Sequence, residues 1–296
     1  MGLKDTCVSA LECADCANLM QGLDCEQWGD TEICLNFRVG RSKMLSKISE
    51  QGIMNSELKA MPLKISVLYF GIPSLYFWLL TKYLTPYLNR TVGIHPAMSW
   101  FITGFLVFIP LFFAACLFAM KEGNAGSFKA LLTRLRLKKF TKRDWAWATG
   151  GLLAVLVLTG LIFGVSSLLS TKMGIPALKT TPGFMEFEPF KPAERWMLFV
   201  WLGMFFFNIV GEEIFWRGYI LPRQELAHGK YAWLINSIFW GVFHISFGRD
   251  LLIILMPTLV VLPLAVYRTK NTAVGIFIHG VFNGPMFILV SLGIVK

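Results

Sequence analysis

The sequence predicts an all-α protein, a polytopic transmembrane helical bundle of about seven to eight spans. Hydrophobic residues make up 55% of the 296 residues and charged residues only 16%, whereas charged residues approach a quarter of an ordinary soluble domain. Several uncharged stretches are long enough to cross a bilayer as a helix, which takes roughly 20 residues. Basic residues gather in short segments between these stretches, as they do in the cytoplasmic loops of membrane proteins.

Seven apolar stretches account for the predicted spans. They cover residues 65–81, 96–120, 145–171, 196–211, 231–248, 251–267 and 271–295. The fourth remains uncharged only to Gly211, where Glu212 and Glu213 follow. Residues 172–195 hold four prolines, so we expect an external connection without a long helix. Seven spans place the C-terminus outside, and an eighth helix would reverse that end.

The loop between the second and third spans is strongly basic. Its cationic residues are Lys121, Lys129, Arg134, Arg136, Lys138, Lys139, Lys142 and Arg143. The positive-inside rule places this loop in the cytoplasm, and the N-terminus with it. The formal charge of +10 is therefore interpreted as a topology signal and not as a nucleic-acid surface. Phe128 and four leucines alternate with the cations, which predicts either an amphipathic helix on the membrane surface or an ordinary solvated loop.

Residues 1–60 differ in composition and are predicted to be a separate cytoplasmic extension, with the transmembrane domain covering 61–296. The segment has no basic start followed by an apolar core, so it does not resemble a secretory signal. It contains Cys7, Cys13, Cys16, Cys25 and Cys34, which are not expected to form disulfides in a reducing compartment. Cys13 and Cys16 have the spacing of half a zinc site, but no second close pair completes it, and a tail with free thiols is the alternative.

Carboxylates within apolar segments are the first candidates for chemistry, because a charge at bilayer depth costs several kcal/mol. Glu213 and Arg217 are four residues apart, so on a helix they share a face and are expected to form an ion pair. Glu212 points about 100° away from its neighbour and has no partner within the motif. It is therefore the better candidate for a general base.

Two histidines in later spans extend this set. His279 and Asn283 lie one helical turn apart and offer two adjacent hydrogen-bond donors, as a developing oxyanion requires. His244 lies in the fifth span. A lone histidine on an apolar helix is more often an interhelical hydrogen-bonding residue, but the set as a whole favours catalysis. Counting residues places Glu212 at the cytoplasmic end of its span and His244 about 20 Å into its own, so straight helices would not bring them together.

These motifs resemble the CAAX protease and bacteriocin-processing family, also called the Abi family, of intramembrane glutamic-type endopeptidases. The resemblance consists of Glu-Glu-x-x-x-Arg beginning at Glu212, a histidine four residues after an aromatic residue, and His-x-x-x-Asn beginning at His279. The sequence from Gly211 to Arg223 is also very similar to the one usual in this family. The resemblance covers roughly residues 130–290 and is specific only when the three motifs are combined. Residues 1–60 have no counterpart in it.

The resemblance implies a role for each matching residue. Glu212 corresponds to the glutamate that activates water, and His244 to the histidine that shares this water. His279 and Asn283 correspond to the pair that stabilises the oxyanion.

The same resemblance implies supporting residues and the absence of a cofactor. Glu213 and Arg217 correspond to a supporting ion pair, and Trp240 replaces the family's phenylalanine, an aromatic exchange expected to preserve packing. Glutamate and histidine also bind zinc. No His-Glu-x-x-His motif is present, however, and asparagine is a poor zinc ligand, so metal-independent hydrolysis is expected.

The predicted function is an intramembrane endopeptidase that hydrolyses a peptide bond near the membrane. The expected partners are the lipid bilayer and a peptide or lipidated-protein substrate, with no nucleic acid. The expected location is the cell membrane in a prokaryote and the endoplasmic reticulum in a eukaryote. The alternative is a transporter or a bacteriocin immunity protein in which the buried glutamates and histidines form a proton relay; a transporter would be expected to show repeated halves.

Overall fold

A computed structural model describes residues 58–122, 127–185 and 188–294. Residues Glu57–Lys296 form one compact unit, and the predicted cysteine segment and its zinc alternative lie outside the described residues. The described part contains helices and no strand, which confirms the predicted fold class. The long helices are α4 (Leu63–Leu79), α5 (Pro96–Glu122), α7 (Lys142–Met173), α8 (Met197–Phe206), α9 (Leu221–His228), α10 (Ala232–Phe243), α11 (Arg249–Thr269) and α12 (Thr272–Ser291). A short helix, α6 (Phe128–Arg134), precedes α7.

Six helical stretches in the described residues have the length and apolar composition to cross a membrane. The fourth of them, Met197–Phe247, spans 51 residues and contains a reversal. Its first arm joins α8 to α9 through two π-helical segments, η6 (Phe207–Gly211) and η7 (Ile214–Ile220). The turn η8 (Gly229–Tyr231), where Gly229 has a φ of 54°, then reverses the chain into α10. This stretch therefore contains both the fourth and the fifth predicted spans.

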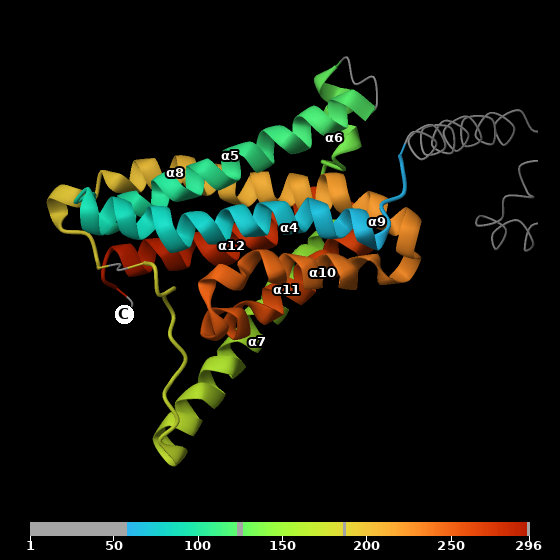
Figure 1. Cartoon of the computed structure of the whole chain (residues 1–296). Coiled ribbons are helices and arrows are strands. Elements are labelled where there is room, and N and C mark those ends of the chain that lie inside the picture. Colours follow the sequence, from blue (N-terminus) through green and yellow to red (C-terminus); the bar gives the residue numbers. More distant parts are fainter. Residues whose placement is uncertain (1–57, 123–126, 186–187, 295–296) are drawn as a thin grey trace, which may run out of the picture. The chain divides into compact units, whose positions relative to one another are not determined.

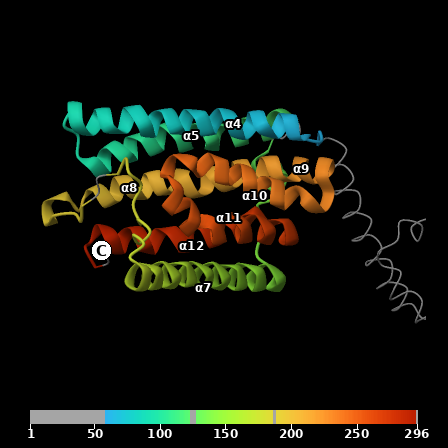
Figure 2. The same ribbon diagram turned by 60° about the horizontal axis from the view of Figure 1, so that its bottom comes forward.

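The middle of the first arm is enclosed by protein. Every residue from 211 to 224 is buried, and the surrounding elements include α5, α10 and α12 (Figures 1 and 2). Glycine allows the closest approaches: a Cβ atom at Gly211 would lie 2.9 Å from the Phe108 carbonyl, and one at Gly218 would lie 2.9 Å from the Leu135 carbonyl. The charged residues of this arm therefore contact protein on all sides and not lipid.

The helix α7 packs on the bundle with only one half. Its buried residues, Asp144, Ala148, Gly151, Val155 and Thr159, recur every three or four positions and form one stripe. This stripe faces α11 and α12. Figure 1 shows the C-terminal half of α7 running away from the other helices. The chain leaves α7 at Gly174, with a φ of 67°, and the described residues of the connection to α8 contain one 3-10 turn and no long helix, as the prolines predict.

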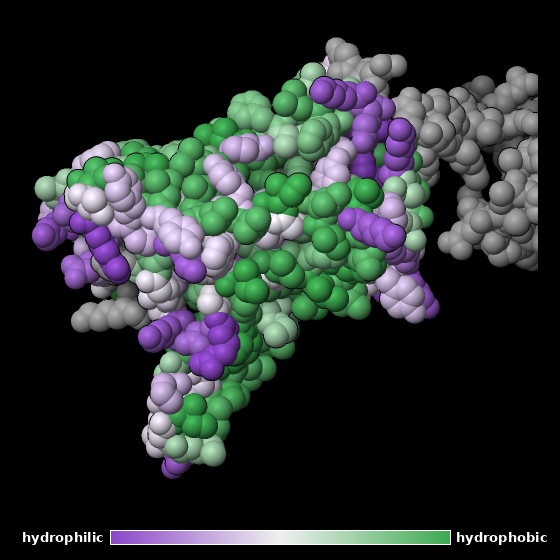
Figure 3. Space-filling model, in the orientation of Figure 1, coloured by the Kyte–Doolittle hydropathy of each residue, from purple (hydrophilic) through white to green (hydrophobic). Residues whose placement is uncertain are grey.

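The outer surface is apolar over the helices. Many large hydrophobic side chains are exposed, including Ile72, Phe113, Leu161 and Phe199. On the face shown in Figure 3, hydrophobic residues cover the helices and hydrophilic residues lie toward the ends of the bundle and at the connection after α7. This surface and the candidate spans are those of an integral multi-pass membrane protein.

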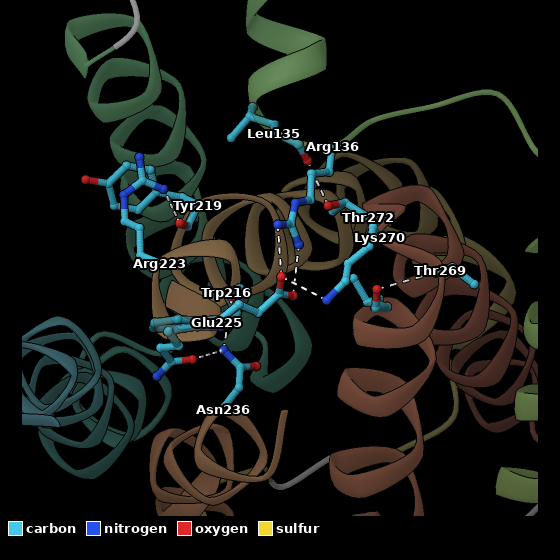
Figure 4. A network of polar contacts seen from close by, with 12 residues as sticks. Leu135, Arg136, Trp216, Tyr219, Arg223, Glu225, Asn236, Thr269, Lys270 and Thr272 are labelled. Atoms are coloured by element: carbon cyan, nitrogen blue, oxygen red, sulfur yellow. Dashed lines mark hydrogen bonds and ion pairs between the residues drawn. The ribbon is translucent and has the colours of Figure 1, made fainter. Parts of the chain in front are cut away.

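The basic segments meet at one end of the bundle. Glu225 of α9 binds Arg136 through two hydrogen bonds of 2.9 and 3.0 Å, and Lys270 at 2.9 Å (Figure 4). Arg223 also pairs with Glu122 at the end of α5. Burial lowers the pKa of Lys270, and the Glu225 carboxylate partly offsets this effect. The predicted cytoplasmic loops therefore share one end, and the side of the membrane that this end faces stays a prediction.

The helix α6 differs from a free amphipathic helix. It covers only seven residues. Leu135, at its C-terminal cap, is 2% exposed and packs against Gly218, whereas Phe128 at its start is 75% exposed. The Leu135 carbonyl accepts a hydrogen bond of 2.7 Å from the Thr272 hydroxyl. The apolar side of this segment thus packs partly on the protein itself.

Candidate active site

The helix that carries Glu212 is longer than predicted. The fourth span was predicted to cover residues 196–211. In the structure, α8, η6, η7 and α9 instead continue as one helical arm to His228. Glu212 and His244 lie equally far from His228 along the chain, 16 residues to either side. The depth mismatch expected from the sequence therefore disappears. The buried charges after Gly211 lie inside this helical arm and do not end the span.

The Glu212 carboxylate is fixed by two nitrogen donors. Its Oε1 atom accepts a hydrogen bond of 2.7 Å from Nδ2 of Asn208, one turn earlier on the same helix. Its Oε2 atom accepts a hydrogen bond of 2.7 Å from Nε1 of Trp240 on α10. Glu212 is 1% exposed, and a carboxylate buried to this extent requires such partners. The hydrogen-bond partners of Glu212, Asn208 and Trp240, therefore lie outside the Glu-Glu-x-x-x-Arg motif.

Glu213 links two helices. Its Oε1 atom lies 3.1 Å from an Nη atom of Arg217, which confirms the predicted i, i+4 pair, and 3.0 Å from Nδ1 of His279 on α12. All three side chains are buried. The Arg217 guanidinium also stacks over the Trp240 ring, 3.6 Å from its centroid. The ion pair therefore also orients the His279 ring.

His244 is held at the end of α10. Its Nδ1 atom lies 2.9 Å from the Trp240 carbonyl. Because a carbonyl only accepts, Nδ1 carries the proton of this bond, and Nε2 remains for another partner. The His244 and His279 rings lie nearly perpendicular to the Trp240 ring, with centroids 5.2 and 5.4 Å from that of the indole. Trp240 thus contacts Glu212, Arg217 and both histidines.

The last predicted site residue, Asn283, lies one turn after His279 on α12 and is half-buried. The structure therefore brings Glu212, His244 and His279 around one indole, with Asn283 on the same helix as His279. Within the described ranges, no three His, Cys, Asp or Glu side chains are grouped to hold a metal ion. Metal independence stays a prediction.

Two features of this site were missed from the sequence. Asn208 was not singled out, although its i, i+4 spacing to Glu212 within an apolar helix was visible. Trp240 was considered only as an aromatic packing residue, and its indole donor was overlooked. The hydrogen bond between Trp240 and Glu212 joins residues 28 positions apart, so no local spacing predicts it.

Residues 194–284 match the family model described as type II CAAX prenyl endopeptidase Rce1-like. This segment contains Glu212, Arg217, His244, His279 and Asn283, and the resemblance seen in the sequence is confirmed over it. The match favours a CAAX-type protease over the transporter and immunity alternatives. No curated protein and no solved structure matches the chain.

Proposed function

We propose that the chain is a membrane endopeptidase of the CAAX type that hydrolyses a peptide bond with a water activated by Glu212. The observation that carries this proposal is the convergence of Glu212, His244 and His279 around the buried Trp240 indole. A carboxylate and two imidazoles that come from three different helices and meet inside an apolar bundle are the groups that acid–base hydrolysis requires.

The hydrogen bonds suggest how one water is held. His244 donates from Nδ1 to a carbonyl, so its Nε2 accepts one proton of the water while Glu212 accepts the other. Glu212 takes its proton as the water oxygen attacks the peptide carbonyl. The same proton then passes to the leaving amine as the C–N bond breaks, and the glutamate returns to its starting state.

His279 supplies the charge that the oxyanion needs. Its Nδ1 atom donates to Glu213, so donation from Nε2 as well requires a ring that carries both protons. Two carboxylates are then balanced by the Arg217 guanidinium and the His279 imidazolium. Balance of this kind lowers the cost of burying all four groups. The oxyanion binds His279 together with Asn283, one turn further along α12.

Cleavage of a lipidated peptide tests the proposal. The full chain is reconstituted into liposomes with a peptide that ends in a farnesylated cysteine and three further residues, and mass spectrometry follows release of the tripeptide. The unprenylated peptide tests whether the lipid is required. We expect Glu212→Gln to lower kcat at least a hundredfold, the contribution of a general base.

The matched control is Glu188→Gln, which makes the same chemical change on an exposed residue of the connection between α7 and α8. It is expected to cleave at the wild-type rate. Equal rates for Glu212→Gln and the wild type would show that Glu212 is not the base and would refute the proposed mechanism.

A further inference from the structure

The carboxylate of Glu212 is held from both ends by side chains that have no assigned part in the hydrolysis. We propose that Asn208 and Trp240 form a two-donor clamp that fixes the orientation of Glu212, which makes both of them positioning residues for the reaction. This inference rests on the proposed function, in which Glu212 is the base.

Each oxygen of the carboxylate has its own donor. Asn208 donates to Oε1 and Trp240 to Oε2, both at 2.7 Å. This distance is at the short end for a nitrogen donor and is typical of hydrogen bonds to an ionised acceptor. With one donor on each oxygen, the carboxylate cannot rotate about its terminal bond without losing both hydrogen bonds.

The two donors are held to different degrees. Trp240 is 1% exposed, and its ring is covered by the Arg217 guanidinium and bordered by both histidines. Asn208 is half-buried on η6, one turn before Glu212 on the same helix, so its amide lies within reach of the carboxylate. The clamp therefore connects the helix of Glu212 to α10, the helix that ends at His244.

Fixed orientation is what a general base needs. A carboxylate oxygen accepts more than one hydrogen bond, so each Glu212 oxygen keeps capacity for a water proton. When the base is held in one orientation, its free acceptor position stays directed toward the water shared with His244. The side chain then does not need to change rotamer before it reacts. A phenylalanine at position 240 would have no N–H group and could not form this side of the clamp.

Two substitutions remove one donor each. Trp240→Phe removes the indole N–H and keeps an aromatic ring, while Asn208→Leu removes the amide donor at similar volume and leaves Trp240 intact. Because each lost hydrogen bond is to a charged group, we expect kcat of each variant to fall roughly tenfold to a hundredfold. KM should remain within twofold of the wild type, since neither residue is assigned to substrate binding.

The outcomes separate the clamp from the proposed function. A wild-type protein that cleaves no peptide overturns the proposed function. A wild-type protein that cleaves, with kcat unchanged or raised in either variant, overturns the clamp, because the donors then do not position the base. A parallel rise in KM in both variants also overturns it and indicates a disturbed binding site.

A second measurement does not depend on activity. Nitrogen-15 labelling of tryptophan gives an indole N–H resonance for each of the 10 tryptophans, and the one missing in Trp240→Phe is that of Trp240. We expect this resonance to lie downfield in the wild type and to move upfield in Glu212→Gln, because the acceptor loses its charge. It should stay in place in Glu188→Gln, and an unchanged position in Glu212→Gln would contradict the clamp.

Discussion

Gly275 lies on α12 against the Glu213 carboxylate, and adding one methyl group there tests how tightly the ion pair is held. A Cβ atom at this position would overlap Oε2 of Glu213 and would lie 2.9 Å from a methyl carbon of Val266. Overpacking of a core costs about 1–3 kcal/mol. If Glu213 moves away instead, the pair with Arg217 and the bond to His279 are lost, at about 3–5 kcal/mol for a broken buried pair. Alanine recovers at most about 1 kcal/mol of helix propensity.

The substitution Gly275→Ala should therefore destabilise the protein by up to about 4 kcal/mol and lower its cleavage rate. The control is Gly280→Ala on the same helix, where the added Cβ would lie 3.6 Å from Ile209, an ordinary contact. Thermal unfolding in detergent, followed by circular dichroism, should give a midpoint several degrees below wild type for Gly275→Ala and no decrease for Gly280→Ala. Equal midpoints and equal cleavage rates for the two variants would show that Glu213 is not confined as described.

Three further predictions concern the charged groups. Arg217→Lys keeps the charge but loses the planar guanidinium that pairs with Glu213, so we expect a lower unfolding midpoint and at least a tenfold loss of cleavage. Glu225→Gln should lower stability by about 1 kcal/mol and leave cleavage within twofold of wild type, because its pairs with Arg136 and Lys270 lie at the bundle end. Burial lowers the pKa of Lys270 in the folded state, so its ammonium opposes folding at low pH, and stability should rise as the pH passes from the folded toward the unfolded pKa. In Lys270→Met this rise should be smaller when unfolding midpoints are compared between neutral and alkaline pH, and an identical pH dependence would count against the shift.

The apolar spans were predictable because a helix that crosses the lipid needs an uncharged apolar stretch of about 20 residues, which is visible in the sequence. The stretches 96–120, 145–171 and 271–295 correspond closely to α5, α7 and α12. The prediction that the span beginning at Trp196 ends at Gly211 was wrong. Four charged residues follow Gly211, and charged residues are typical of the loops between spans. Their burial by neighbouring helices reverses that interpretation, and burial by neighbours is tertiary information that local hydropathy does not contain.

The site was predictable in its members but not in its connections. The spacing of Glu213 and Arg217 on one helix gave their ion pair, which the structure confirms. The bonds from His279 to Glu213 and from Trp240 to Glu212 join separate helices and depend on how these pack. The same holds for Glu225 and Arg136, which are 89 positions apart.

The enclosure of residues 211–224 has a consequence for biogenesis. A charged residue at the centre of a membrane helix costs about 2.5–3.5 kcal/mol on insertion, and this segment carries Glu212, Glu213, Arg217 and Arg223. Its compensating partners include Trp240 and His279, which the ribosome adds later. The helical arm that carries Glu212 and Glu213 therefore gains its full set of partners only after α12 has been inserted. A chain truncated before α12 should be recognised and degraded by membrane quality control.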